Sequence, residues 1–201
     1  MEQPRNPIKT PHRKQLRRSD APGDARFLTF SCFRRQPFLS RQRSCEWFLD
    51  AMNRSRETHG FDLWAFVIMP EHVHLLVYPG HDWHSVADML YTLKKSVTSR
   101  ALAFVRRSTP EFLVRMEDRQ PSGRASHRFW QRGGGYDENL YTPAKIWEKI
   151  DYIHANPVRR GLCESPTDWR WSSARAYEIG TSEPVRIDFD SLPDDRRERK
   201  S

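Results

Sequence analysis

The sequence has 201 residues, which suffices for one domain with a hydrophobic core and leaves little room for a second. Its 34 basic and 26 acidic residues give a formal net charge of +8, which favours a polyanionic partner such as a nucleic acid. The 3 cysteines are widely spaced, and no stretch approaches the roughly 20 apolar residues of a membrane span, which argues against a disulfide-stapled secreted protein and a membrane protein.

Residues 1–25 combine prolines with basic residues and contain few apolar ones, so they cannot bury enough surface to offset the entropy lost on ordering. We predict a flexible basic arm, in which Arg17 and Arg18 are candidates for a non-specific grip on DNA phosphates. A solvated tail without a role is an equally good interpretation. The arm has no apolar core of signal-peptide length, so we expect the protein in the cytoplasm.

The next elements predict a strand, a helix and two further strands. Residues 27–33 alternate in polarity and are rich in aromatics, as a strand should be. Residues 43–60 carry apolar side chains at helical spacing and end on a glycine, which predicts a helix. Two β-rich runs are then separated around Pro70 and Glu71, which predicts an antiparallel pair.

The longest predicted helix spans residues 85–107. Ser85 with Asp88 three residues later resembles a capping box, and apolar residues recur along one face of the helix. Four polar residues lie off this stripe: Lys94, Lys95, Thr98 and Arg100. They form either a solvated face or, beside a DNA site, contacts to phosphates.

The last third of the chain is less regular. Residues 106–127 contain turn formers and broken periodicity, which predicts a long loop, and the next residues predict a short strand that ends in a glycine triplet. Residues 142–156 predict a helix with Thr142 as N-cap and an end before Pro157. The following segment should wrap back over the core, and residues 181–201 are predicted to be a disordered tail.

In order, the elements are β, α, β, β, α, β and α. The simplest assembly is an α+β fold, an αβ sandwich with an antiparallel sheet close to the split βαβ arrangement. We expect this domain to span residues 26–180.

A pair of histidines lies in the motif MPEHVHLLVYP, residues 69–79. His72 and His74 are two positions apart on a predicted strand, so their side chains point to the same face, and we expect Glu71 to be solvated on the other face. Neutral imidazole is a common ligand of divalent metals, so the pair could converge on one cation. Two histidines without a metal are the alternative, because this spacing alone is weak evidence.

The helix over residues 143–156 carries Tyr152 off its buried stripe, with Asn156 one turn later on the same face. A phenolic oxygen there could attack phosphorus and form a covalent intermediate, beside a metal that polarises the phosphate. Asn156 could supply an amide oxygen as a third ligand. From spacing alone, the simpler interpretation is that Tyr152 packs at the edge of the stripe and Asn156 ends the helix. His154 should point away from Tyr152 and receives no role.

Three motifs, MPEHVHLLVYP, RFWQRG and YIHANPVRRGL, occur in an order and separation that resemble the single-tyrosine HUH transposases, in particular the REP-associated tyrosine transposases. The resemblance runs from about Phe27 to Tyr177. It implies a ferredoxin-like domain of the HUH endonuclease type that binds a hairpin of single-stranded DNA. It also implies cleavage of a nearby phosphodiester that leaves a 5′-phosphotyrosine link and a free 3′-OH, with strand transfer as the reverse step.

Carried over by motif position, the resemblance implies Tyr152 as the nucleophile, His72 and His74 as metal ligands and Asn156 as the third ligand of Mg²⁺ or Mn²⁺. We therefore expect a metal-dependent single-stranded DNA endonuclease and strand transferase that acts in cis as a monomer, with a homodimer as the alternative. The alternative function is a catalytically silent, nucleic-acid-binding regulator with the same fold.

Overall fold

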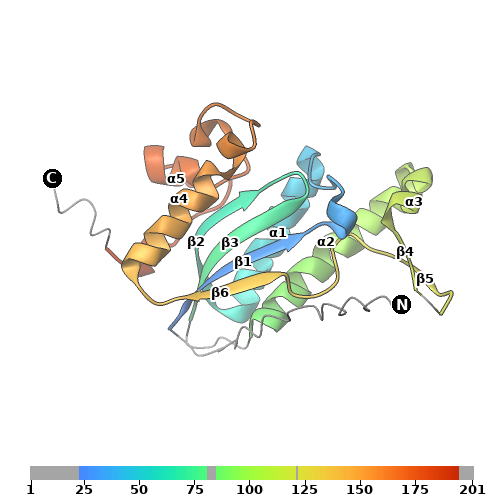
Figure 1. Cartoon of the computed structure of the whole chain (residues 1–201), viewed down its shortest axis with the longest axis horizontal. Coiled ribbons are helices and arrows are strands. Elements are labelled where there is room, and N and C mark those ends of the chain that lie inside the picture. Colours follow the sequence, from blue (N-terminus) through green and yellow to red (C-terminus); the bar gives the residue numbers. More distant parts are fainter. Residues whose placement is uncertain (1–22, 81–84, 121, 195–201) are drawn as a thin grey trace, which may run out of the picture.

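The central element is a sheet of 4 antiparallel strands (Figure 1). The computed structural model describes residues 23–80, 85–120 and 122–194. In spatial order the strands are β2 (Phe61–Ile68), β3 (His72–Pro79), β1 (Ala25–Ser31) and β6 (Tyr136–Leu140). The helices α1 (Gln42–His59) and α2 (Val86–Ser108) lie in the connections from β1 to β2 and from β3 to β6. This order and pairing confirm the predicted α+β, ferredoxin-like sandwich.

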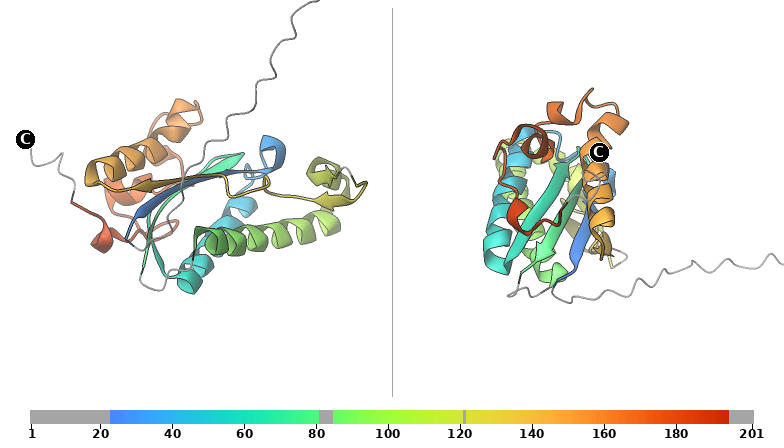
Figure 2. Two further views of the ribbon diagram at one scale, coloured as in Figure 1. Left: turned by 60° about the horizontal axis from the view of Figure 1, so that its bottom comes forward. Right: turned by 90° about the vertical axis from the view of Figure 1, so that its left-hand side faces the viewer.

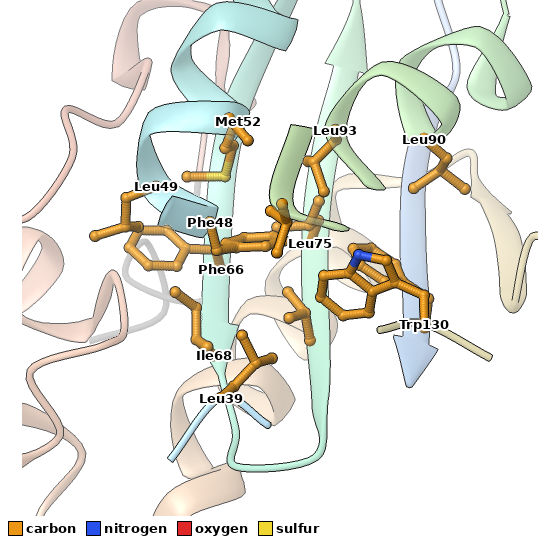
Figure 3. Close-up of a cluster of buried hydrophobic side chains, with 14 of the residues drawn as sticks. Leu39, Phe48, Leu49, Met52, Phe66, Ile68, Leu75, Leu90, Leu93 and Trp130 are labelled. Atoms are coloured by element: carbon orange, nitrogen blue, oxygen red, sulfur yellow. The ribbon is translucent and has the colours of Figure 1, made fainter. Parts of the chain in front are cut away.

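The sheet separates two hydrophobic layers, and Figure 2 shows the helices on its two sides. α1 and α2 cover one face, whereas α4 (Pro143–Arg159) packs against β2 and β3 on the other. Strand alternation divides β1 between the layers, because Leu28 and Phe30 point toward α1 and α2 and Phe27 points toward α4. Figure 3 shows the first layer, where side chains from α1, α2 and the sheet pack together, including Phe48, Phe66, Leu75, Leu93 and Trp130.

Both long helices begin and end close to the predicted positions. Ser85 caps α2, because its hydroxyl accepts the backbone N–H of Asp88 at 3.0 Å. α1 ends at Gly60, whose φ of 61° is left-handed and suits a glycine that stops a helix. The β2–β3 pair around Pro70 is the predicted antiparallel pair.

The helix α4 starts as predicted and continues three residues further. Thr142 accepts the backbone N–H of Lys145 and Pro143 occupies the first turn, as expected for a helix start. The predicted end at Asn156 is wrong, because the helix runs through Pro157 to Arg159. Pro157 lacks an N–H and so cannot donate within the helix, but the N–H of Arg160 still bonds the carbonyl of Asn156 at 3.1 Å and closes the last turn.

The predicted long loop over residues 106–127 is wrong. A short helix α3 (Leu113–Met116) follows α2, and β4 (Glu117–Arg119) then pairs with β5 (Ala125–His127) in a separate hairpin. Arg128 and Arg132 both bond the Asp118 carboxylate, which ties the hairpin to the chain that follows it. These contacts join residues that no local periodicity connects.

The strand predicted before the glycine triplet lies after it, as β6. Residues before the triplet instead send Phe129 and Trp130 into the core. Gly135 has a φ of 88°, and a Cβ at this position would lie 2.1 Å from the carbonyl oxygen of Thr29. Only glycine fits so close to β1, and this approach sets the start of β6.

The segment after α4 wraps back over the sheet through α5 (Ala174–Ile179), as predicted. The predicted disorder from residue 181 is wrong for the described part of that segment. Val185 and Ile187 are buried in the first layer, and Asp188 accepts the backbone N–H of Leu63 at 2.8 Å. Two apolar residues in a charged, proline-containing stretch gave too weak a pattern to reveal this anchor. Residues 195–201 lie outside the described residues.

The predicted basic arm, with Arg17 and Arg18, falls almost entirely outside the described residues, which begin at Gly23. β1 starts two residues later, at Ala25. Within the described ranges, no helix combines the length and the apolar character that a bilayer crossing requires.

Candidate active site

His72 and His74 lie on β3 and face the α4 side of the sheet. Their Nε2 atoms are 3.0 Å apart, and the two rings are nearly perpendicular. The Nδ1 atom of His72 lies 3.2 Å from the Glu71 carboxylate, and the Nδ1 atom of His74 lies 2.7 Å from the Thr29 hydroxyl. The Nδ1 atoms of both histidines therefore have partners, and their Nε2 atoms face each other.

Both imidazoles are buried, with exposed fractions of 8% and 4% for His72 and His74. Burial lowers the pKa of His72 below its ordinary value, although the adjacent Glu71 opposes this shift. Burial, with smaller contributions from His72 and Lys149, lowers the pKa of His74 to about 3. At neutral pH both rings are uncharged, which is the form that can donate a lone pair.

Tyr152 lies on α4 directly above the histidine pair. Its ring meets His74 edge-on, with 5.5 Å between ring centroids, and it meets Phe27 edge-on at 5.9 Å. The side chain is nonetheless 38% exposed, so it is not part of the closed core. The pocket of about 710 Å³ under this helix is lined by His72, His74, Tyr152 and Asn156 together. The four residues singled out for catalysis and metal ligation thus meet in one place.

Asn156 lies one turn after Tyr152 and is buried. Its Nδ2 donates to the backbone carbonyl of Tyr152 at 3.1 Å. Among the described residues its Oδ1 has no hydrogen-bond partner, which leaves one acceptor in the pocket. The third predicted ligand is therefore present with a free oxygen.

The rim of the pocket is positively charged through Arg35, Lys149, Arg159 and Arg160. Lys149 pairs with Glu138 at 2.8 Å, and its Nζ also lies 4.4 Å from the ring centroid of Phe27. A rim of this charge suits phosphate oxygens.

The prediction that Glu71 is solvated is wrong. Its side chain is largely buried and accepts hydrogen bonds from His72 and, at 2.8 Å, from Arg160. Burial tends to raise its pKa, but the bond from Arg160 and the neighbouring His72 lower it overall, so it is ionised. Strand alternation failed here because β3 begins at His72, one residue later.

The predicted DNA-contacting residues on α2 do not reach this pocket, because α2 covers the opposite face of the sheet. Lys94, Lys95 and Thr98 line a separate groove, whereas Arg100 bonds the carboxylate of Asp50 on α1 at 2.7 Å. His154, for which no role was expected, points away from Tyr152 and lies 2.8 Å from the Ser173 hydroxyl.

Several residues that line the pocket were not predicted from the sequence. Lys149, Tyr152, Asn156 and Arg159 recur three or four residues apart on α4, so helical spacing could have found the two basic ones. Thr29 had no such signal, because it meets His74 only through the β1–β3 register.

No model of a known protein family matches the chain. Over 126 residues it is 28% identical to a protein of Haemophilus influenzae named "Putative REP-associated tyrosine transposase"; the match covers 63% of this chain and 66% of that protein, slightly under two thirds of its length. The solved structure of a REP-associated tyrosine transposase bound to a REP hairpin superimposes with a TM-score of 0.62 at 21% identity, over 92% of this chain and 96% of that one.

The chain is similar to the REP-associated tyrosine transposases. This confirms the resemblance inferred from the three motifs. The structural likeness to a REP-associated tyrosine transposase covers nearly the whole chain, so it establishes the fold of both layers of the sandwich.

Proposed function

We propose that this protein is a transposase that cuts and rejoins one strand of hairpin-containing DNA, with Tyr152 as the nucleophile. The observation that carries the proposal is the meeting of an exposed tyrosine on α4 with a buried, uncharged histidine pair on β3 in one basic pocket. The similarity to REP-associated tyrosine transposases supports the reaction class.

The phenolic oxygen of Tyr152 would attack the phosphorus of a phosphodiester. The bond from phosphorus to the 3′-oxygen breaks, the phenol loses its proton, and the departing 3′-oxygen takes up a proton as a free 3′-OH. The downstream DNA stays linked through its 5′-phosphate to Tyr152. Attack of a 3′-OH on this link reverses the step and joins strands. Lys149, Arg159 and Arg160 at the rim would stabilise charge on the phosphate oxygens.

The donor atoms in the pocket fit a divalent metal. The Nε2 atoms of His72 and His74 lie 3.0 Å apart, so both uncharged imidazoles could donate a lone pair to one divalent cation. The described residues contain no cluster of three or more His, Cys, Asp or Glu side chains suited to a metal. We propose His72, His74 and Asn156 as the protein ligands, because the three side chains line the same pocket and Asn156 can offer an amide oxygen. When bound, the ion would polarise the scissile phosphate, and two imidazoles favour Mn²⁺ over Mg²⁺.

Glu71 and Thr29 would hold the ring orientations. A carboxylate on Nδ1 of His72 keeps a proton on that nitrogen and leaves Nε2 as the donor atom, and the Thr29 hydroxyl can do the same for His74. In this role they orient the histidines without touching the DNA.

The proposed partner is DNA with a hairpin. A relative of the same fold is bound to a REP hairpin, and the net charge of +8 suits a polyanion. Because Tyr152 and both histidines of one chain share the pocket, we propose cleavage in cis by a monomer. A cytoplasmic location stays a prediction from the sequence.

The test uses hairpin oligonucleotides labelled at either end and incubated with Mg²⁺, Mn²⁺ or EDTA. We expect a metal-dependent covalent adduct that carries only the 3′ label, since the link is to a 5′-phosphate. Tyr152→Phe should abolish the adduct and keep hairpin binding. Tyr141→Phe is the matched control, because Tyr141 is an exposed tyrosine outside the pocket. Hairpin binding without an adduct in the wild type would contradict cleavage and favour the silent regulator.

A further inference from the structure

Two consecutive residues that follow β1, Arg34 and Arg35, have left-handed backbone conformations. Their φ angles are 51° and 52°, and they are the non-glycine residues with positive φ in the part of the chain that the structure describes. Figure 1 shows this turn, in blue, at the end of β1. A residue with a Cβ is strained at such angles, so glycine or asparagine is usual there. The chain therefore keeps this turn at a cost in stability.

Hydrogen bonds inside and outside the turn hold it in the strained conformation. The N–H of Arg35 donates to the carbonyl of Cys32 at 3.0 Å, and the N–H of Arg34 donates to Oε1 of Gln131 at 3.1 Å. The N–H of Cys32 donates to the carbonyl of Glu71 at 2.8 Å, so the turn is anchored beside the histidine pair. Strain that neighbouring contacts fix in this way is typical of active sites.

The two arginines of the turn point to different places. Arg35 lines the Tyr152 pocket, whereas Arg34 does not, because its guanidinium lies over the ring of Phe33 at 4.9 Å from the centroid. Burial is the main cause of the lowered pKa of His72, and the positive charge of Arg35 adds to that shift. The charge of Arg35 is therefore felt at one of the two histidines of the pocket.

Arg35 differs from the other cations of the pocket because its side chain is unengaged. Lys149 and Arg160 each pair with a glutamate, and the guanidinium of Arg159 lies 5.5 Å from the ring centroid of Tyr152. Among the described residues, the guanidinium of Arg35 has neither a hydrogen-bond acceptor nor a carboxylate or aromatic ring as a partner. All its N–H donors are left for a ligand.

Lys149 and Arg35 approach the pocket from opposite ends of β1. The Nζ atom of Lys149 lies 4.4 Å from the ring centroid of Phe27 near the start of the strand, whereas Arg35 follows the end of the strand. Tyr152 lies between them, because its ring contacts His74, which pairs with β1 between these two points. A phosphate beside Tyr152 thus meets a lysine from one end and a planar guanidinium from the other.

We propose that Arg35 is a further catalytic residue, whose guanidinium binds the non-bridging oxygens of the phosphate that Tyr152 attacks, and that the left-handed turn places it there. The inference rests on the proposed function. A guanidinium presents parallel N–H donors that match phosphate oxygens, and it stays charged throughout the reaction. It can therefore hold the phosphodiester and stabilise the charge that develops during the attack.

The test places glycine at each position of the turn. Arg35→Gly and Arg34→Gly relieve the same kind of backbone strain, so each variant should unfold at the wild-type temperature or above it. Adduct formation with a saturating hairpin oligonucleotide and Mn²⁺ should fall about 100-fold in Arg35→Gly and stay within about twofold of the wild type in Arg34→Gly. Arg34→Gly is the matched control, because Arg34 does not line the pocket.

A third variant, Arg35→Lys, keeps the charge and loses the planar fork. We expect its adduct formation to lie about 10-fold below the wild type, between the wild type and Arg35→Gly. A residue with a merely structural role would move the unfolding temperature and leave adduct formation alone. Equal adduct formation in Arg35→Gly and Arg34→Gly would therefore overturn the proposal, whatever the unfolding temperatures of the two variants.

Binding in EDTA separates this inference from the proposed function. With single-stranded extensions on the hairpin, Arg35→Gly should reduce the slope of log affinity against log salt concentration by about 0.7 relative to Arg34→Gly, because one phosphate contact is lost. Wild-type adducts with equal rates in the two variants mean that only the role of Arg35 fails. A slope that depends on Arg35 without any wild-type adduct means that the phosphate contact holds and cleavage fails.

Discussion

The two faces of the sheet differ in how completely they are covered. α1 and α2 together cover one face around a large apolar layer, whereas α4, mainly over β2 and β3, and parts of the segment that follows it pack on the other. The part of that face formed by β1 and β3 near Thr29 and His74 stays open as the Tyr152 pocket. α4 and the segment after it leave the part over β1 and the start of β3 uncovered, so polar side chains there can meet a ligand.

The largest expected effect comes from Tyr152→Phe on the open face. We expect adduct formation to fall at least about a thousandfold, because the nucleophilic oxygen is removed, while the free energy of unfolding changes by less than about 0.5 kcal/mol. Gel quantification of the adduct and urea unfolding measure the two quantities. A large loss of stability would mean that Tyr152 is a packing residue after all.

The sealed face should show the reverse behaviour. Phe48 is fully buried between α1 and the sheet, so Phe48→Ala should cost about 3–5 kcal/mol in the free energy of unfolding. Measured well below its unfolding temperature, the variant should still form the adduct, since Phe48 does not line the pocket. A cost below about 1 kcal/mol would show that the two faces are equally loosely packed.

The same difference explains what the sequence could predict. Apolar periodicity located the elements of the sealed face, and strand alternation placed His72 and His74 on one side. Neither pattern revealed the roles of Thr29 and Glu71. Thr29 reaches His74 only through the pairing of β1 with β3, and Glu71 lies one residue before the strand. Gly135 set the start of β6 through a close backbone approach, which carries no periodic signal.

A smaller effect is expected at the residues that orient the histidines. Glu71→Gln removes the charge that holds Nδ1 of His72 and bonds Arg160, so Mn²⁺ affinity should fall about 10-fold to 100-fold. Titration followed by electron paramagnetic resonance measures this without any turnover. Thr29→Val, which removes the partner of His74, should act in the same direction.

Hairpin affinity in EDTA serves as the control for these variants and should stay within about twofold of the wild type. Glu148→Gln is the matched control for metal binding, because Glu148 is an exposed carboxylate of α4 that pairs with Lys145 and does not line the pocket. Equal Mn²⁺ affinity in Glu71→Gln and Glu148→Gln would remove Glu71 from the site.

The smallest expected effect concerns Lys95 and Arg100, two basic residues of α2 that the sequence pattern grouped together as candidates for contacts to DNA phosphates. Lys95 lines the groove between α2 and residues 127–134, so Lys95→Met should reduce the slope of log affinity against log salt concentration by about 1. Arg100 lines neither site and its charge is already paired with Asp50, so Arg100→Met should leave the slope unchanged and cost less than about 1 kcal/mol of stability. Equal slopes for the two variants would mean that DNA contacts α2 diffusely. Different slopes would confine the phosphate contacts to the face of α2 that borders Trp130, because both residues carry the same charge and differ mainly in what they face.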